Sequence, residues 1–176
     1  MYSDSAKINE VITEYRKPVF RQALRILGNV CAAEEVTQEV FLRVYKGLDR
    51  FREDSQLSTW IYKILANRCL SRLKKTPIHF ISLEEVESDE VTIDPDSNPE
   101  EQHIKHDTET RLAHSISRLP SKEATAITLY YDDDKSYDEI ARIMLVPSGT
   151  VAVLLHRGRI HLHQLLVPQE NKERKQ

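Results

Sequence analysis

Residues 33–51, AEEVTQEVFLRVYKGLDRF, predict a single amphipathic helix. Apolar residues recur every four positions along it: Val36, Val40, Val44 and Leu48. Phe41 widens the same stripe, and Glu34 and Glu35 fall in the expected first turn, where the helix dipole favours anions. The stripe indicates a helix that packs on a core through one face, so neighbouring segments must supply the rest of that core.

The opposite face of this helix combines charge with one apolar residue. At about 100° per residue, Leu42 lies among the polar side chains of that face: Glu35, Gln38, Glu39 and Lys46. An apolar residue ringed by acids and an amide suits a helix that docks on another protein. An isolated exposed leucine is also common on protein surfaces, so periodicity alone leaves both interpretations open.

The segments on either side of this helix are also predicted to be helical. Residues 8–27 carry a helical apolar pattern in which Pro18 should begin or kink a helix, and Gly28-Asn29 should cap its end. A short connection through Cys31 follows. Beyond the polar loop 51–57, the next helix should be capped by Ser58 or Thr59.

The second half of the chain predicts shorter helices, over residues 110–119, 121–131, 136–145 and 150–166. Ser136 and Glu139 have the spacing of a capping box, and residues 146–149 predict a tight turn. Two helices joined by such a turn, the second longer and carrying arginines, are typical of a helix-turn-helix. The three acids at 132–134 could suggest Mg²⁺, but we expect them to form a solvated turn.

The chain as a whole is predicted to be all-α, with two small helical domains joined by a flexible acidic linker, because Gly is scarce and strand-like alternation is absent. We expect a first domain at 1–75, the linker at 76–106, a second domain at 107–168 and a polar tail at 169–176. Residues 1–75 carry a net charge of +5, residues 76–110 carry −10 and residues 111–176 carry +2. Two basic blocks around an acidic one suit two domains that face nucleic acid, joined by a segment that DNA repels. We therefore expect the two domains to be loosely coupled in the free protein.

Several classes of protein are disfavoured by the sequence. No apolar run approaches the about 20 residues of a membrane span, and the N-terminus lacks a signal pattern, so we expect a cytoplasmic protein without membrane insertion. Cys31 and Cys69 have no partner at metal-ligand spacing, and Cys69 falls on an inward stripe. No nucleophile, base and orienting group stand out together, so we expect no enzyme and no cofactor.

The sequence resembles a known family over both predicted domains. AAEEVTQEVFLRVYKGLDRF (32–51) and STWIYKILANRCLSRL (58–73) resemble the polymerase-binding and promoter −10 regions of extracytoplasmic-function sigma factors, which belong to the bacterial sigma-70 family. LPSKEATAITLYYDDDKSYDEIA (119–141), VPSGTV (146–151) and HRGR (156–159) resemble the −35-binding domain of that family. The resemblance implies a sigma factor that binds core RNA polymerase and promoter DNA, with a probable anti-sigma factor as a further partner.

The resemblance also assigns roles to residues. The surface for the clamp helices of the largest polymerase subunit corresponds to Glu35, Gln38, Glu39, Leu42 and Arg43, and the polymerase flap is implied as a second contact. The −10 element corresponds to the loop 51–57, which captures a flipped base in the family, and to the helix after it; the residues are Phe51, Arg52, Ser55, Trp60, Lys63, Asn67 and Arg68. From the residues alone, the outward face with Trp60, Lys63 and Asn67 suits base stacking and phosphate contact, or is simply a solvated face.

The −35 element corresponds to the last helix, through Thr150, Ala152, Val153, His156, Arg157 and Arg159. Relatives usually carry a basic residue, a serine and an arginine where this chain has Ala152, Val153 and Leu154. Ala and Val offer base edges no hydrogen bond, though they can touch a thymine methyl. We therefore expect weak −35 affinity, and Val153 and Ile160 could instead serve an anti-sigma helix or pack on the first domain.

One alternative keeps the helix-turn-helix and drops the polymerase. Such a response-regulator-like repressor or activator would need an effector or phosphoacceptor domain, and residues 1–75 do not have the pattern of one.

Overall fold

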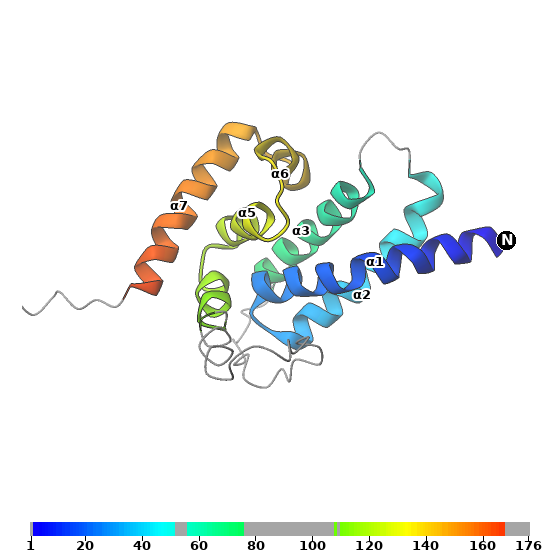
Figure 1. Ribbon diagram of the computed structural model, residues 1–176, viewed down its shortest axis with the longest axis horizontal. Helices are drawn as coiled ribbons and strands as arrows, with labels where there is room; N and C mark the ends of the chain where they lie inside the picture. The colour runs from blue at the N-terminus through cyan, green and yellow to red at the C-terminus, as the bar shows by residue number, and fades with distance from the viewer. Residues whose placement is uncertain (1, 52–55, 76–107, 109, 168–176) are drawn as a thin grey trace, which may run out of the picture.

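The computed structural model describes residues 2–51, 56–75, 108 and 110–167, and every regular element in these ranges is a helix (Figure 1). The all-α prediction is therefore confirmed for them. The predicted linker at 76–106 and tail at 169–176 fall outside the described residues.

The N-terminal domain is built from α1 (Tyr2–Leu27), α2 (Val30–Gly47), the short 3-10 helix η1 (Leu48–Arg50) and α3 (Leu57–Lys75). Each helix buries the apolar stripe that its sequence predicts, and α2 packs against both α1 and α3. The innermost residues are Val19, Ala23 and Ile26 of α1, Val36, Val40 and Val44 of α2, and Ile61, Leu65 and Cys69 of α3. Burial raises the pKa of the Cys69 thiol to about 12, as suits a small core residue.

The connection between α1 and α2 is shorter than predicted. Gly28 has a φ of 63°, and its amide donates to the Leu24 carbonyl at 2.7 Å, so it ends α1 as expected. Asn29 does not share this role, because its side chain accepts from the Ala32 amide at 2.9 Å and caps the start of α2.

Three predictions for this region change as a result. Since α2 begins at Val30, Glu34 and Glu35 lie beyond its first turn. Cys31 lies in α2 and is exposed, whereas a connection was expected there. Pro18 lies inside α1, so no helix begins there.

The C-terminal domain contains a helix at residues 110–117, α5 (Ser121–Tyr131), α6 (Tyr137–Met144) and α7 (Ser148–Leu166). The predicted capping box is present, since the Ser136 and Glu139 side chains each bond the other residue's backbone amide. The last helix begins two residues earlier than predicted, directly after Pro147. The core of this domain is formed by Ile127, Leu129, Ile140, Ile143, Val151 and Leu155.

The pair α6 and α7 has helix-turn-helix geometry, with an angle of 100° between the two helices. Leu145 makes the turn in the left-handed conformation, at a φ of 56°. In the part of the chain that the structure describes, no single helix is long and apolar enough to cross a membrane; only the bent pair α6–α7 meets that length and composition, when both are taken together.

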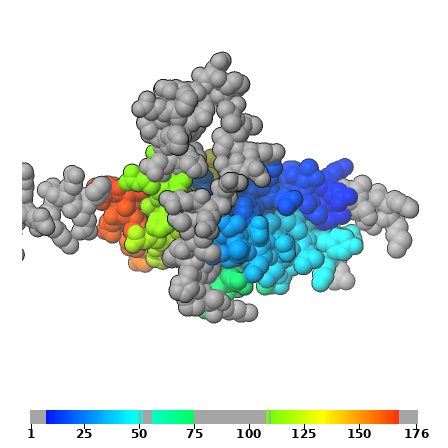
Figure 2. Space-filling model, turned by 90° about the horizontal axis from the view of Figure 1, so that it is seen from below, coloured from blue at the N-terminus to red at the C-terminus, as the bar shows by residue number. Residues whose placement is uncertain are grey.

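The two domains pack against each other, which contradicts the expectation of loose coupling. The helix α6 lies on α3, and α5 contacts both α1 and α3 (Figure 1). Seen from below, the α1–α2 surface and the α7 surface lie toward opposite ends of one continuous body (Figure 2). The expectation of loose coupling rested on the acidic linker, whose charge does not indicate the contacts between the domains. Among these contacts, Arg25 of the N-terminal domain pairs with Asp132 of the C-terminal domain.

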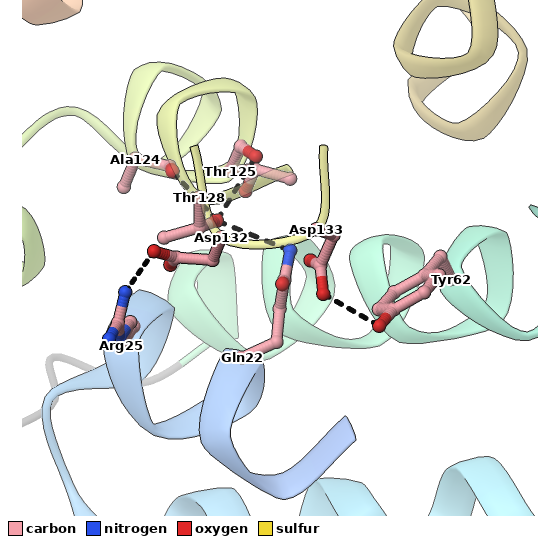
Figure 3. A network of polar contacts seen from close by, with 8 residues as sticks. All are labelled: Gln22, Arg25, Tyr62, Ala124, Thr125, Thr128, Asp132 and Asp133. Carbon is pink, nitrogen blue, oxygen red and sulfur yellow. Dashed lines mark hydrogen bonds and ion pairs between the residues drawn. The ribbon is translucent and has the colours of Figure 1, made fainter. Parts of the chain in front are cut away.

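The acids at 132–134 do not form the solvated turn that we expected. Asp132 and Asp133 are both half-buried against the N-terminal domain, where Asp132 pairs with Arg25 and Asp133 accepts a hydrogen bond from Tyr62 (Figure 3). Asp134 remains exposed, with a φ of 49° that Asp tolerates better than most residues. Two of the three consecutive aspartates, Asp132 and Asp133, therefore take part in a tertiary contact.

The close approach of α7 to α5 generates a first testable prediction. A Cβ at Gly158 would lie 2.8 Å from Ile127 Cγ1, and Ile127 is itself buried. We expect Gly158→Ala to destabilise the protein by about 1–3 kcal/mol through overpacking, measured as the free energy of unfolding in urea. The matched control is Gly149→Ala in the same helix, where a Cβ would meet nothing within 4 Å. It should be neutral or stabilising by up to about 1 kcal/mol, and equal stability of both variants would contradict the packing.

Candidate functional site

The polar face of α2 is accessible, and Leu42 lies in its middle with 60% of its surface exposed. Gln38, Glu39 and Arg43 are exposed on the same helix. The two carboxylates on this face form ion pairs with arginines of α3. Arg72 lies 2.6 Å from Glu35, and Arg68 lies 3.2 Å from Glu39. The face predicted from periodicity therefore exists as one surface built on α2 and α3.

These ion pairs position side chains more than they stabilise the fold. Each pair is substantially exposed, and exposed pairs contribute only about 0–1 kcal/mol. Arg43 also lies within 3.9 Å of Glu39, so two arginines share one carboxylate. The result is a set of charges held at defined places around an exposed apolar residue.

The structure separates Arg68 from the other residues assigned to the −10 element. Asn67 is exposed on α3 and Lys63 is half-buried, whereas Arg68 bonds Glu39 toward the face of α2. Arg52 and Ser55 fall outside the described residues.

Two aromatic side chains pack against each other near the start of α3. The ring of Trp60 lies 5.2 Å from that of Phe51, at an interplanar angle of 34°. Trp60 also covers the end of α2, since a Cβ at Gly47 would lie 2.9 Å from the indole Cζ2. Gly47 therefore leaves room for the indole.

The outward face of α7 offers few groups to DNA. The residues assigned to the −35 element that are exposed along this face are Thr150, Ala152, Val153, His156 and Arg157, and Ile160 is exposed beside them. This helix contains no Asp or Glu along its full length, so the charge of its face is positive or neutral.

Arg159 differs from the rest of this set. Its Nε donates to the Tyr131 hydroxyl at 2.8 Å, and its guanidinium lies 5.7 Å from the ring centroids of Tyr130 and Tyr131. His161 similarly bonds the buried Glu123 at 2.6 Å. Both side chains attach α7 to α5, so among the arginines of α7 Arg157 is the more accessible to a ligand.

Sequence reasoning missed Arg72, Gln22, Arg25 and Tyr62. Arg72 and Arg68 are four residues apart, as are Glu35 and Glu39, and this matched spacing on two helices was the available signal. The interdomain contacts of Gln22 and Tyr62 join residues far apart in sequence, and no local pattern indicates them.

Comparisons with known proteins agree with this architecture. Residues 11–76 match the family model of Sigma-70 region 2, and residues 109–162 match that of Sigma-70, region 4. The chain is 31% identical over 169 residues to the ECF RNA polymerase sigma factor SigW of Bacillus subtilis, an alignment that covers 93% of this chain and 90% of the relative. The chain belongs to the extracytoplasmic-function sigma factors of the sigma-70 family. It is thus an RNA polymerase sigma factor, and the response-regulator-like alternative is not supported.

Other relatives place the chain in the same family. It is 32% identical over 164 residues to the ECF RNA polymerase sigma-E factor of Escherichia coli K12, covering 89% of this chain and 84% of that one. Among solved structures, it resembles the sigma factor RpoE of Bartonella quintana in complex with the anti-sigma factor NepR, at a TM-score of 0.69 and 18% identity over 91% of this chain and 96% of that one. CnrH in complex with the cytosolic domain of CnrY gives a TM-score of 0.62 at 17% identity, over 92% and 88% of the two chains. At these identities the structural likeness concerns the fold.

The contact between Gly47 and Trp60 generates a prediction for this sigma factor. Gly47→Ala should displace the indole, because the new methyl group would overlap it. Trp60 is the only tryptophan of the chain, so intrinsic fluorescence and near-ultraviolet circular dichroism report on it directly. We expect both spectra to change while far-ultraviolet circular dichroism stays the same. Gly149→Ala, remote from the indole, serves as the control; wild-type spectra for Gly47→Ala would show that the indole does not rest on this glycine.

Proposed function

We propose that α2 binds core RNA polymerase through the surface formed by Glu35, Gln38, Glu39, Leu42 and Arg43. The observation that carries this is the exposure of Leu42 at the centre of charges that α3 holds in place. An apolar residue inside a polar rim has the composition of an interface centre, where a buried side chain is surrounded by contacts that exclude water. The clamp helices of the largest polymerase subunit are the expected docking partner, as the family resemblance implies.

Leu42→Arg should abolish core binding, because it places an unpaired charge at the centre of this surface. Far-ultraviolet circular dichroism should stay unchanged, since Leu42 is exposed and supports no core contact. The measurement is co-purification with core polymerase at equal protein concentrations. Leu145→Arg is the matched control, because that leucine is 63% exposed but lies in the helix-turn-helix of the other domain. Retention of Leu42→Arg at the wild-type yield would remove α2 from the polymerase interface.

The −10 element is proposed to bind at the loop 51–57 and the adjacent face of α3. Asn67 is exposed on α3, and the Phe51–Trp60 pair supplies aromatic surface about two turns away, at the start of the same helix. Stacking an unpaired base on an aromatic side chain returns about 1–3 kcal/mol per base, which offsets the few kcal/mol that unstacking costs. Binding energy would thus promote opening of the duplex.

Asn67→Ala should lower transcription from the native promoter and relax base preference in the −10 element, since an amide can pair with base edges. Lys63→Ala should instead weaken binding to all sequences alike, because a phosphate contact carries no base information. Transcription in vitro from a matched and a mismatched −10 promoter separates the two effects. If Asn67→Ala reduces both promoters by the same factor, this residue has no reading role.

The −35 element is proposed to contact α7 weakly, mainly through Arg157 and the helix N-terminus. The supporting observations are the exposed Ala152 and Val153, and the attachment of Arg159 to Tyr131. Discrimination between promoters would then depend more on the −10 element than on the −35 element.

Further partners and the mode of action follow from the family. The solved sigma factor RpoE, which has the same fold, is in complex with an anti-sigma factor, and a protein of the anti-sigma class is the corresponding partner proposed for this chain. We infer that the protein acts by binding, with no catalytic role of its own, in the cytoplasm where polymerase and promoter DNA are found. The polymerase flap is the second expected contact, on the C-terminal domain.

A further inference from the structure

Charged side chains on α2 and α3 pair in matched order. Glu35 and Glu39 lie four residues apart on α2, and Arg68 and Arg72 lie four residues apart on α3. Arg72 Nη2 lies 2.6 Å from Glu35 Oε2, and Arg68 Nη1 lies 3.2 Å from Glu39 Oε2. Because the sequence order is reversed between the two helices, α2 and α3 run antiparallel where they pair, and four residues rise about 6 Å in each. These four residues are called the glutamate–arginine ladder below.

The two arginines lie on a different side of α3 from the residues that face solvent. Asn67, Ser71 and Lys74 are exposed, at the spacing of one outward row of a helix. Arg68 and Arg72 each follow a residue of that row by one position, which turns them about 100° around the helix axis. Their side chains are 31% and 38% exposed. Both guanidinium groups therefore lie off the outward row of α3 and against α2.

The arginines restrict the two glutamates without covering them. The side chains of Glu35 and Glu39 stay 56% and 47% exposed while they are paired. A glutamate side chain has several rotatable bonds, and fixing such a side chain on binding weakens affinity by about 2- to 10-fold. Where an arginine already holds the carboxylate, this loss is smaller, because part of the ordering precedes binding. The planar guanidinium suits such a role, since its fork of donors is rigid.

The same pairs contribute little to the stability of the fold. All four side chains are between 31% and 56% exposed, so water screens the attraction between the charges. Arg72 is also imperfectly paired, because its Nε is buried without a hydrogen-bond partner among the described residues. The ladder is therefore better explained by the places that it gives to the two carboxylates than by the energy that it adds to the fold.

We propose that Arg68 and Arg72 are positioning residues of the polymerase-binding surface, and that Arg68 acts there and does not read the −10 element. Each arginine acts through a glutamate of α2, which it holds at a fixed place on the face that exposes Leu42. The inference rests on the proposed function of the α2 surface. It adds two residues of α3, the helix that carries Asn67, to a surface otherwise built on α2.

Binding of the full-length chain to immobilised core polymerase tests the positioning role. Arg68→Ala should raise the dissociation constant about 2- to 10-fold, because Glu39 would then become ordered only on binding. Arg68→Lys keeps a cation within reach of Glu39 and should recover most of the affinity. The matched control is Lys74→Ala, which removes a cation from the exposed row of the same helix and should leave the dissociation constant unchanged.

A double-mutant cycle decides whether Arg68 acts through Glu39. Glu39→Ala alone should weaken core binding, and Arg68→Ala in that background should add less than about a twofold further loss. An arginine that touched polymerase directly would lower the affinity by the same factor in both backgrounds, and that result would overturn the positioning role. Urea unfolding should give each variant nearly the wild-type free energy of unfolding, since an exposed pair contributes little to stability.

Transcription in vitro separates this role from reading of the −10 element. With core polymerase at saturating concentration, the Arg68→Ala holoenzyme should keep the wild-type ratio of transcription from a matched and a mismatched −10 promoter. A smaller ratio would return Arg68 to the −10 element and overturn the inference. Unchanged core binding by Arg68→Ala, in an assay where Leu42→Arg abolishes binding, would overturn the inference alone. Wild-type binding by Leu42→Arg would instead remove the proposed function of the surface, and the inference with it.

Discussion

The ion pair between Arg25 and Asp132, with the adjacent Tyr62–Asp133 hydrogen bond, determines how the functional surfaces of this sigma factor lie relative to one another. Each domain contributes buried apolar residues, and these polar contacts, the packing of α6 on α3 and the contacts of α5 with α1 and α3 together fix the mutual position of the domains. Separating packed apolar side chains costs more free energy than separating a polar contact in which buried acceptors are unpaired. The two domains are thus joined by helix packing as well as by polar contacts.

The two domains differ in the composition of the surface that each exposes to partners. On α2, cations from α3 hold the carboxylates around an exposed leucine, so that surface is already organised while the two domains are packed together. On α7, the exposed residues are mostly small, apolar or neutral, and Arg159 is held by tyrosines of its own domain. Of the two surfaces proposed to bind partners, the α2 surface therefore sets charges around an apolar residue, whereas the α7 surface offers few charged groups.

Much of this could be predicted from the sequence, because the determining signals are local. The four-residue spacing of Val36, Val40 and Val44 placed the core face of α2 and left Leu42 exposed, and the Ser136–Glu139 pair marked the start of α6. The acids at 132–134 were misjudged because local composition says nothing about a cation on another domain. Loose coupling was expected from the acidic linker, and the charge of a linker says nothing about the contacts that the two domains make with each other. The roles of Asn67, Arg157 and the α2 surface remain predictions.

The most direct test is the distance between two spin labels, one at Cys31 of α2 and one at a cysteine introduced by Gln164→Cys on α7. It is determined by pulsed electron paramagnetic resonance in two states of the same protein. In the free chain, we expect one short, narrow distribution of the distance between the two labels. In a complex with core polymerase and promoter DNA, verified by co-purification, we expect this distance to be longer by several tens of ångströms. The −10 and −35 elements are separated by about 85 Å of duplex. The same short distance in both states would contradict the claim that this sigma factor opens in order to bind its promoter.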